Sequence, residues 1–168
     1  EWIERGWVLV NGQPAVVGQR VRPEDELTVD ERAKVKQAER VTILINKPMG
    51  YVSGQAEDGH EPAASLINAQ SRWRSDAHSR RFAGWQLRGL APAGRLDIDS
   101  VGLLVLTQAG RVARDIIGED SEVDKEYLVR VHYTQGAQVV ERDVQSVFPE
   151  EQLARLRHGL ELDGKPLL

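Results

Sequence analysis

The chain of 168 residues is 40% hydrophobic and 29% charged, and its formal net charge at pH 7 is -4. That length accommodates one domain of ordinary size with a small appendage, and the composition is typical of a soluble globular protein. The lack of cysteine excludes disulfides and thiolate zinc sites, and the scattered positions of the four histidines predict no metal site. The apolar runs are much shorter than the ~18 residues that a membrane span needs. Because the sequence opens without a signal peptide, we expect a cytoplasmic protein with no membrane segment.

The first part of the chain, residues 1–31, predicts a small strand-rich unit that cannot bury a core by itself. Its expected elements are a helix end at 1–6, two strands at 7–10 and 13–17 joined by an Asn-Gly turn, and a third short strand at 27–29. The stretch 32–40 is charged and non-periodic, and we interpret it as a linker.

The rest of the chain, residues 41–168, predicts an α+β domain. Its expected elements are a core strand at 41–46, a short helix at 62–67, a buried strand at 103–106, a helix at 109–117, a strand at 125–132, helices at 138–147 and 150–158, and a strand and turn at 159–165. Because helices separate the apolar strands, we expect a mixed, largely antiparallel sheet flanked by helices.

A basic stretch at 71–95 contrasts with the acidic balance of the whole chain, because it holds six arginines and a single acid, Asp76. Trp73, Phe82 and Trp85 are interleaved with the arginines, which are Arg72, Arg74, Arg80, Arg81, Arg88 and Arg95. Arginines among aromatic rings suit phosphates and unstacked bases. A solvated loop with its aromatics in the core is the alternative, but the stretch leads directly to a candidate catalytic loop, which favours contact with RNA.

That loop carries Arg95, Asp97 and Asp99 straight into the apolar strand at 103–106, and a rigid strand is a good support for catalytic groups. One interpretation is a solvated turn with a local Arg–Asp pair. Another is a magnesium-dependent aspartyl-phosphate phosphatase using Asp97 and Asp99. Phosphatases of this kind place the apolar strand before the first aspartate, whereas here the strand follows, so the order argues against that chemistry.

Three segments in the same order resemble the motifs of bacterial ribosomal RNA pseudouridine synthases. They are N-K-P-M-G-Y-V-S at 46–53, G-R-L-D at 94–97 continued by D-S-V-G-L at 99–103, and D-K-E-Y-L-V at 124–129. The resemblance is to the group of small-subunit synthase A and large-subunit synthases B, E and F, and most to the F branch. It implies that a specific uridine of ribosomal RNA, expected in 23S RNA, is isomerised to pseudouridine by an aspartate after base flipping.

The resemblance also implies roles for individual residues. Asp97 is the essential carboxylate, Tyr127 stacks on the uracil, Arg95 fills the space that the flipped base leaves, and Lys47 lies near the active site among the RNA contacts. Alternation around Tyr127 also fits a core tyrosine of a half-buried strand, Lys47 fits an exposed turn lysine equally well, and Asp99 is expected to be structural. The reaction needs no redox step, so we expect no cofactor. We also expect no metal, ribosomal RNA as the partner, and a monomeric enzyme.

Residues 1–31 resemble the latter half of an S-four type RNA-binding module, through G-W-V-L-V-N-G at 6–12. The family's later arginine-rich motif, which pairs with the catalytic aspartate, has no match after Tyr127. We therefore expect the catalytic domain at 41–168 to lack its C-terminal part and the chain to be a piece of a longer protein. A non-catalytic RNA-binding module is the remaining alternative, and it would not need Asp97.

Overall fold

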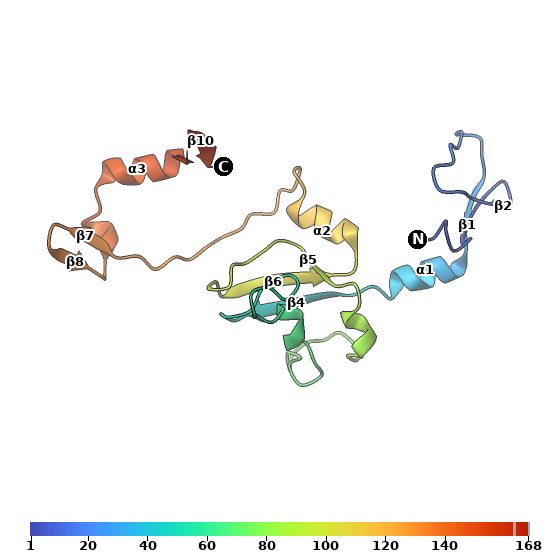
Figure 1. Cartoon of the computed structure of the whole chain (residues 1–168), viewed down its shortest axis with the longest axis horizontal. Coiled ribbons are helices and arrows are strands. Elements are labelled where there is room, and N and C mark those ends of the chain that lie inside the picture. The colour runs from blue at the N-terminus through green and yellow to red at the C-terminus, as the bar shows by residue number, and fades with distance from the viewer. Residues whose placement is uncertain (163, 168) are drawn as a thin grey trace. The chain divides into compact units, whose positions relative to one another are not determined.

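The structure is a computed structural model that describes residues 1–162 and 164–167. It separates into two compact units, Glu1–Val123 and Asp124–Leu168 (Figure 1). None of the helices in the described residues has the length and apolar character that crossing a membrane requires.

The first unit begins with a three-stranded antiparallel sheet in the order β2-β1-β3. Its strands are β1 (Val8–Val10), β2 (Gln13–Pro14) and β3 (Leu27–Val29). Asn11 and Gly12 both have positive φ, 50° and 78°, as the predicted tight turn requires. The three expected strands are confirmed, although β2 ends before the predicted residue 17.

The segment interpreted as a linker contains the helix α1 (Glu31–Ala38). Asp30 caps its N-terminus by accepting a hydrogen bond from the backbone N–H of Arg32 at 2.8 Å. Ala33 is the buried residue of the helix. A single small buried side chain produces no recognisable apolar period, so the sequence pattern did not predict this helix.

A second antiparallel sheet forms the centre of the first unit, in the order β4-β6-β5 (Figure 1). Its strands are β4 (Thr42–Lys47), β6 (Gly102–Thr107) and β5 (Ala91–Pro92). Ile43 pairs with Leu106 and Ile45 with Leu104, so these four side chains share one face. The buried cluster on that face contains Ala63, Ile67, Leu104 and Leu106. The predicted strands and the antiparallel sheet are confirmed.

Short helices complete the first unit, and they leave part of the sheet uncovered. They are η1 (Ala63–Leu66), η2 (Gly84–Leu87) and α2 (Gly110–Ile117). η1 supplies Ala63 to the core, while α2 follows β6 directly. Leu44 and Leu103, on the face opposite the core, remain exposed.

The second unit differs most from the sequence-based expectation. Its elements are the hairpin β7 (Tyr133–Gln135) and β8 (Gln138–Val140), η3 (Val144–Ser146), α3 (Glu150–His158), and the hairpin β9 (Leu160–Leu162) and β10 (Lys165–Leu167). The helix at 150–158 and a strand after it are confirmed. The predicted final turn includes residue 163, which lies outside the described residues.

Two predicted elements of the second unit are wrong. Residues 125–132 have no regular secondary structure, and Leu128 is 94% exposed. A strand needs a neighbour for its backbone hydrogen bonds, and no strand pairs with this segment among the described residues of the unit. The expected helix at 138–147 is replaced by β8 and η3, because Asp143 adopts a left-handed conformation with φ 50° and ψ 40° that ends any helix there.

Candidate active site

Asp97 lies in a loop between β5 and β6 that we call the Asp97 loop, residues 94–100. Gly94 enters the loop with φ 101°, a conformation that favours glycine. The backbone N–H of Ser100 donates to the carbonyl oxygen of Asp97 at 3.0 Å and closes a turn. The Asp97 side chain is exposed. Its carboxylate therefore faces solvent at the entrance to a buried strand.

Both residues beside Asp97 are tied to the turn that follows β4. On one side, the Ser53 hydroxyl accepts from the Leu96 N–H at 2.9 Å and donates to the Leu96 carbonyl at 2.7 Å. On the other side, the Gly50 N–H donates to the Ile98 carbonyl at 2.9 Å. The backbone on either side of the exposed carboxylate is thus held by a neighbouring turn.

Lys47 completes this attachment from inside the protein. Its side chain is fully buried. Its Nζ donates to the carbonyl oxygens of Tyr51 at 2.9 Å, Pro48 at 3.1 Å and Ile98 at 3.4 Å, which occupies all three ammonium protons. Both expectations for Lys47, an RNA contact and an exposed turn lysine, placed it on the surface and are corrected here.

Arg95 and Asp97 are both exposed on the same loop. Within the described residues no ion pair joins them, so the local pair that a solvated turn would make is not formed in the structure. The guanidinium of Arg95 makes no hydrogen bond with the described part of the chain either. Both charged ends remain available to an outside partner.

Asp99 is exposed as well, two residues after Asp97. No group of three or more histidine, aspartate or glutamate side chains in the described ranges is arranged to hold a metal ion. Asp97 and Asp99 therefore have no third protein ligand of this kind beside them, which gives the phosphatase interpretation no support.

Tyr127 belongs to the second unit, where its side chain is 59% exposed. It lies in the segment without regular secondary structure, so the interpretation as a core tyrosine of a strand is wrong for this structure. The ring is accessible for stacking on another aromatic group.

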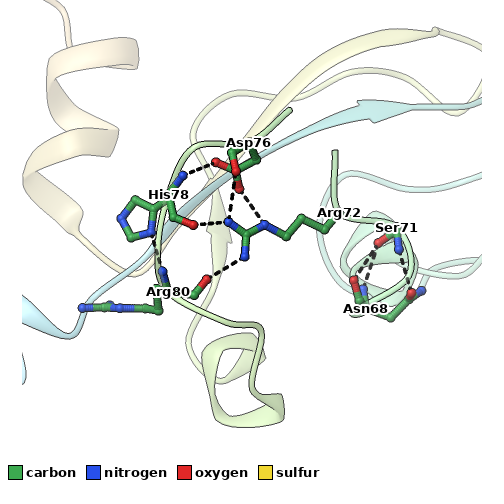
Figure 2. Close-up of polar contacts among 6 residues, drawn as sticks. All are labelled: Asn68, Ser71, Arg72, Asp76, His78 and Arg80. Atoms are coloured by element: carbon green, nitrogen blue, oxygen red, sulfur yellow. Dashed lines mark hydrogen bonds and ion pairs between the residues drawn. The ribbon is translucent and has the colours of Figure 1, made fainter. Parts of the chain in front are cut away.

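Two of the arginines predicted to bind RNA, Arg72 and Arg80, donate hydrogen bonds within the protein, and Figure 2 shows those of Arg72. The Arg72 guanidinium donates to the Asp76 carboxylate at 2.9 Å and to the carbonyl oxygens of Arg80, at 2.9 Å, and His78. Arg80 in turn donates to the carbonyl oxygens of Glu39 at 2.7 Å and Ala38 at 3.2 Å, at the C-terminal end of α1. These guanidinium groups bond to backbone carbonyls and, for Arg72, to the Asp76 carboxylate, so their contact with phosphates stays a prediction that would have to compete with these bonds.

The loop that Arg72 organises has a second internal anchor. The Ser71 hydroxyl accepts from the Asn68 N–H and donates to the Asn68 carbonyl, both at 3.0 Å (Figure 2). A hydrogen bond from the His78 N–H, together with the charge of Arg72, lowers the pKa of Asp76 below its usual range. The loop therefore has a defined shape of its own at neutral pH.

Three other arginines of the basic stretch, Arg74, Arg81 and Arg88, are exposed. Their guanidinium groups make no hydrogen bond or ion pair with the residues that the structure describes. Trp73, 76% exposed, stands next to Arg74, and Trp85 is also exposed. These side chains keep the combination of cation and aromatic surface that RNA binding requires.

A cavity of about 550 Å³ lies between β4 and the loop at 68–82. Its lining includes Ile43, Ile45, Phe82 and Trp73, but not Asp97. The lining of this cavity therefore does not include the exposed carboxylate of Asp97.

Comparisons with known proteins agree with the motif order. A family model described as RNA pseudouridylate synthase matches residues 41–166. The chain is 32% identical over 154 residues to ribosomal large subunit pseudouridine synthase B of Pseudomonas aeruginosa, covering 89% of this chain and 36% of the relative. It is 34% identical over 132 residues to dual-specificity RNA pseudouridine synthase RluF of Escherichia coli, covering 77% of this chain and 40% of the relative.

The chain thus spans about two fifths of the length of these relatives, or less. Among solved structures, one described as a pseudouridylate synthase aligns with 68% of this chain and 43% of its own, at a TM-score of 0.33 and 23% identity.

Proposed function

We propose, from the premise that this chain belongs to the RNA pseudouridylate synthase family, that it serves the conversion of a specific uridine of large-subunit ribosomal RNA to pseudouridine. The observation that carries the proposal is the Asp97 loop, which lies within the matched region and presents an exposed carboxylate on a backbone held from both sides. Similarity to two large-subunit or dual-specificity RNA synthases supports the choice of substrate class.

Asp97 is the catalytic carboxylate of the proposal. The bond between uracil N1 and ribose carbon 1 breaks, the base turns over, and a new bond forms from the same ribose carbon to carbon 5 of the base. Carbon 5 then loses its proton, and N1 ends protonated, so the isomerisation balances without any other reactant. A carboxylate acts here as nucleophile or as general base. No electrons are gained or lost overall, so the reaction proceeds without a redox cofactor.

Tyr127 and Arg95 serve the flipped base in this proposal. An exposed tyrosine ring offers a flat apolar surface on which a uracil taken out of its stack can lie. Arg95, two residues before Asp97 and exposed, fills the space that the base leaves in the RNA.

RNA contact falls to the exposed part of the basic stretch. Arg74, Arg81 and Arg88 supply charge for phosphates, and Trp73 supplies a stacking surface.

The proposal also includes the organisation of the chain. Residues 1–31 form part of an S-four type module, residues 32–40 join this part to the catalytic domain, and the catalytic domain comprises residues 41–168. The enzyme works as a monomer in the cytoplasm and needs no metal ion.

The test is a map of pseudouridines in ribosomal RNA from cells that lack the full-length protein, complemented with the wild type or with Asp97→Asn. The asparagine keeps the size of the side chain but removes the ionised oxygen. We expect one pseudouridine to disappear, to return with the wild type, and to stay absent with the variant.

With purified full-length protein, Asp97→Asn is expected to bind RNA normally and to lose at least about 1,000-fold in turnover. Activity within tenfold of the wild type would overturn the assignment of Asp97. Restoration of the pseudouridine by Asp97→Asn would likewise overturn the assignment of Asp97. An unchanged map in cells without the protein would leave a role in RNA binding alone.

A further inference from the structure

A buried serine to which the sequence analysis assigns no role of its own is joined to the Asp97 loop. Ser53 is 5% exposed, and its hydroxyl makes two hydrogen bonds to a single residue, Leu96, through both the N–H and the carbonyl. A hydroxyl has one proton to donate, and Ser53 commits it to the carbonyl that precedes Asp97.

The position of this carbonyl decides what the serine can control. The Leu96 carbonyl and the Asp97 N–H belong to the same planar peptide unit, so fixing the oxygen fixes the plane from which Asp97 departs. The next carbonyl, that of Asp97 itself, is held by the Ser100 N–H at 3.0 Å. Loss of the Ser53 hydroxyl would leave the first of these two planes free to rotate.

We propose that Ser53 is a positioning residue for Asp97, setting the direction in which the carboxylate leaves the backbone. The inference rests on the proposed function. Ser53 is buried and touches the Asp97 loop through Leu96, so it has no part in holding RNA. Its removal should therefore act on the rate of the chemical step and not on substrate affinity.

The experiment uses the full-length protein and compares Ser53→Ala and Ser53→Thr with Ser71→Ala. Ser71 is a matched control because its hydroxyl makes the same pair of hydrogen bonds to one residue, Asn68, both at 3.0 Å, in a loop that does not carry Asp97 (Figure 2). Turnover of a ribosomal RNA fragment gives kcat and KM, RNA titration gives the active fraction, and melting gives Tm.

Misplacement of a reacting group by about 1 Å can cost a factor of the order of 100. We expect Ser53→Ala to lower kcat about 10- to 100-fold with KM within about twofold, Ser53→Thr to stay within about threefold of wild-type kcat, and Ser71→Ala within about twofold. Should Ser53→Ala not fold, Ser53→Cys decides, since it keeps the size of the side chain and weakens both hydrogen bonds. Its kcat is expected to fall about tenfold.

A kcat for Ser53→Ala within threefold of the wild type would overturn the inference. The same holds if Ser53→Thr loses as much kcat as Ser53→Ala, or if the inactive fraction of the Ser53→Ala protein accounts for its lower kcat. Asp97→Asn separates the two proposals. If it is inactive while Ser53→Ala remains active, only the role of Ser53 fails. If the wild type makes no pseudouridine, the proposed function itself fails. If Asp97→Asn makes it normally, the assignment of Asp97 fails, and the positioning role of Ser53 fails with it.

Discussion

Replacing Lys47 by methionine tests the attachment of the Asp97 loop to the turn after β4. Methionine keeps most of the length of the side chain and removes three hydrogen bonds, to Pro48, Tyr51 and Ile98. The Ile98 carbonyl keeps its bond from the Gly50 N–H, so two carbonyls lose a donor. An unsatisfied buried group costs about 1–3 kcal/mol. Pro48 is exposed and Tyr51 is half-buried, so water can reach part of what the lysine leaves. Since the apolar replacement also avoids burying an ammonium, we expect a net loss of about 2 kcal/mol in unfolding free energy.

The measurement is urea unfolding followed by circular dichroism, with hydrogen exchange of the Gly50 and Ser100 amides as a local probe. Lys34→Met is the control. Lys34 is exposed and, among the residues that the structure describes, forms an ion pair with Glu31 at the surface of α1. Loss of this pair is expected to cost about 0.5 kcal/mol or less. A Lys47→Met variant as stable as Lys34→Met, with unchanged exchange at both amides, would refute the reasoning.

Two further predictions concern the basic stretch and the first helix. Changing Arg74, Arg81 and Arg88 together to glutamate is expected to weaken RNA binding. The slope of the logarithm of the binding constant against the logarithm of the salt concentration should become shallower by up to about three counterions, whereas Arg111→Glu on α2 leaves this slope unchanged. An unaltered slope in the triple variant would exclude these phosphate contacts. Hydrogen bonds from the Arg32 side chain and backbone lower the pKa of Asp30 to about 2, below the ~3.9 of an unfolded aspartate. The ionised Asp30 cap therefore stabilises α1 above pH ~4, and this stabilisation is lost as the pH falls toward 2. NMR titration of the Asp30 carboxyl checks this, and a midpoint near 4 would contradict it.

The parts of the fold that sequence predicted correctly depend on neighbours in the chain. The apolar runs of β4 and β6 contain enough β-branched and leucine side chains to identify buried strands, and Asn11 with Gly12 identifies a turn by backbone preference alone. Asp97 was selected as a candidate from a local signal as well, because its loop and the strand after it form one continuous motif, and its catalytic role stays a prediction.

The roles of the basic residues depend instead on distant partners. Lys47 donates to a carbonyl 51 residues away, and Arg80 to two carbonyls more than 40 residues before it. A cation that binds phosphate and a cation that binds a carbonyl have the same local sequence, so only the fold distinguishes Arg72 and Arg80 from Arg74 and Arg81. The link between Ser53 and Leu96 could not be predicted for the same reason, because the two residues are far apart in the sequence. The only local indication was the position of Ser53 at the end of the motif at 46–53.

The second unit shows the limit of alternation as a signal. Residues 125–132 alternate as a half-buried strand does, yet a strand also needs a partner for its backbone, and the described part of this unit provides none. Periodicity records which side chains suit a sheet and does not record whether a neighbouring strand is present.

The Asp97 loop combines two requirements that oppose each other in most loops. In the proposed reaction the carboxylate has to be exposed to reach a ribose or a flipped base, and exposed loops are usually mobile because few contacts hold them. Here the restraint acts on the backbone and leaves the side chain free: Ser53 holds Leu96, while Gly50 and Lys47 hold Ile98. The remaining freedom of Asp97 is rotation about its own side-chain bonds. The backbone from which the carboxylate departs is therefore set before RNA arrives, so only rotation of the Asp97 side chain remains to be fixed in the proposed chemical step.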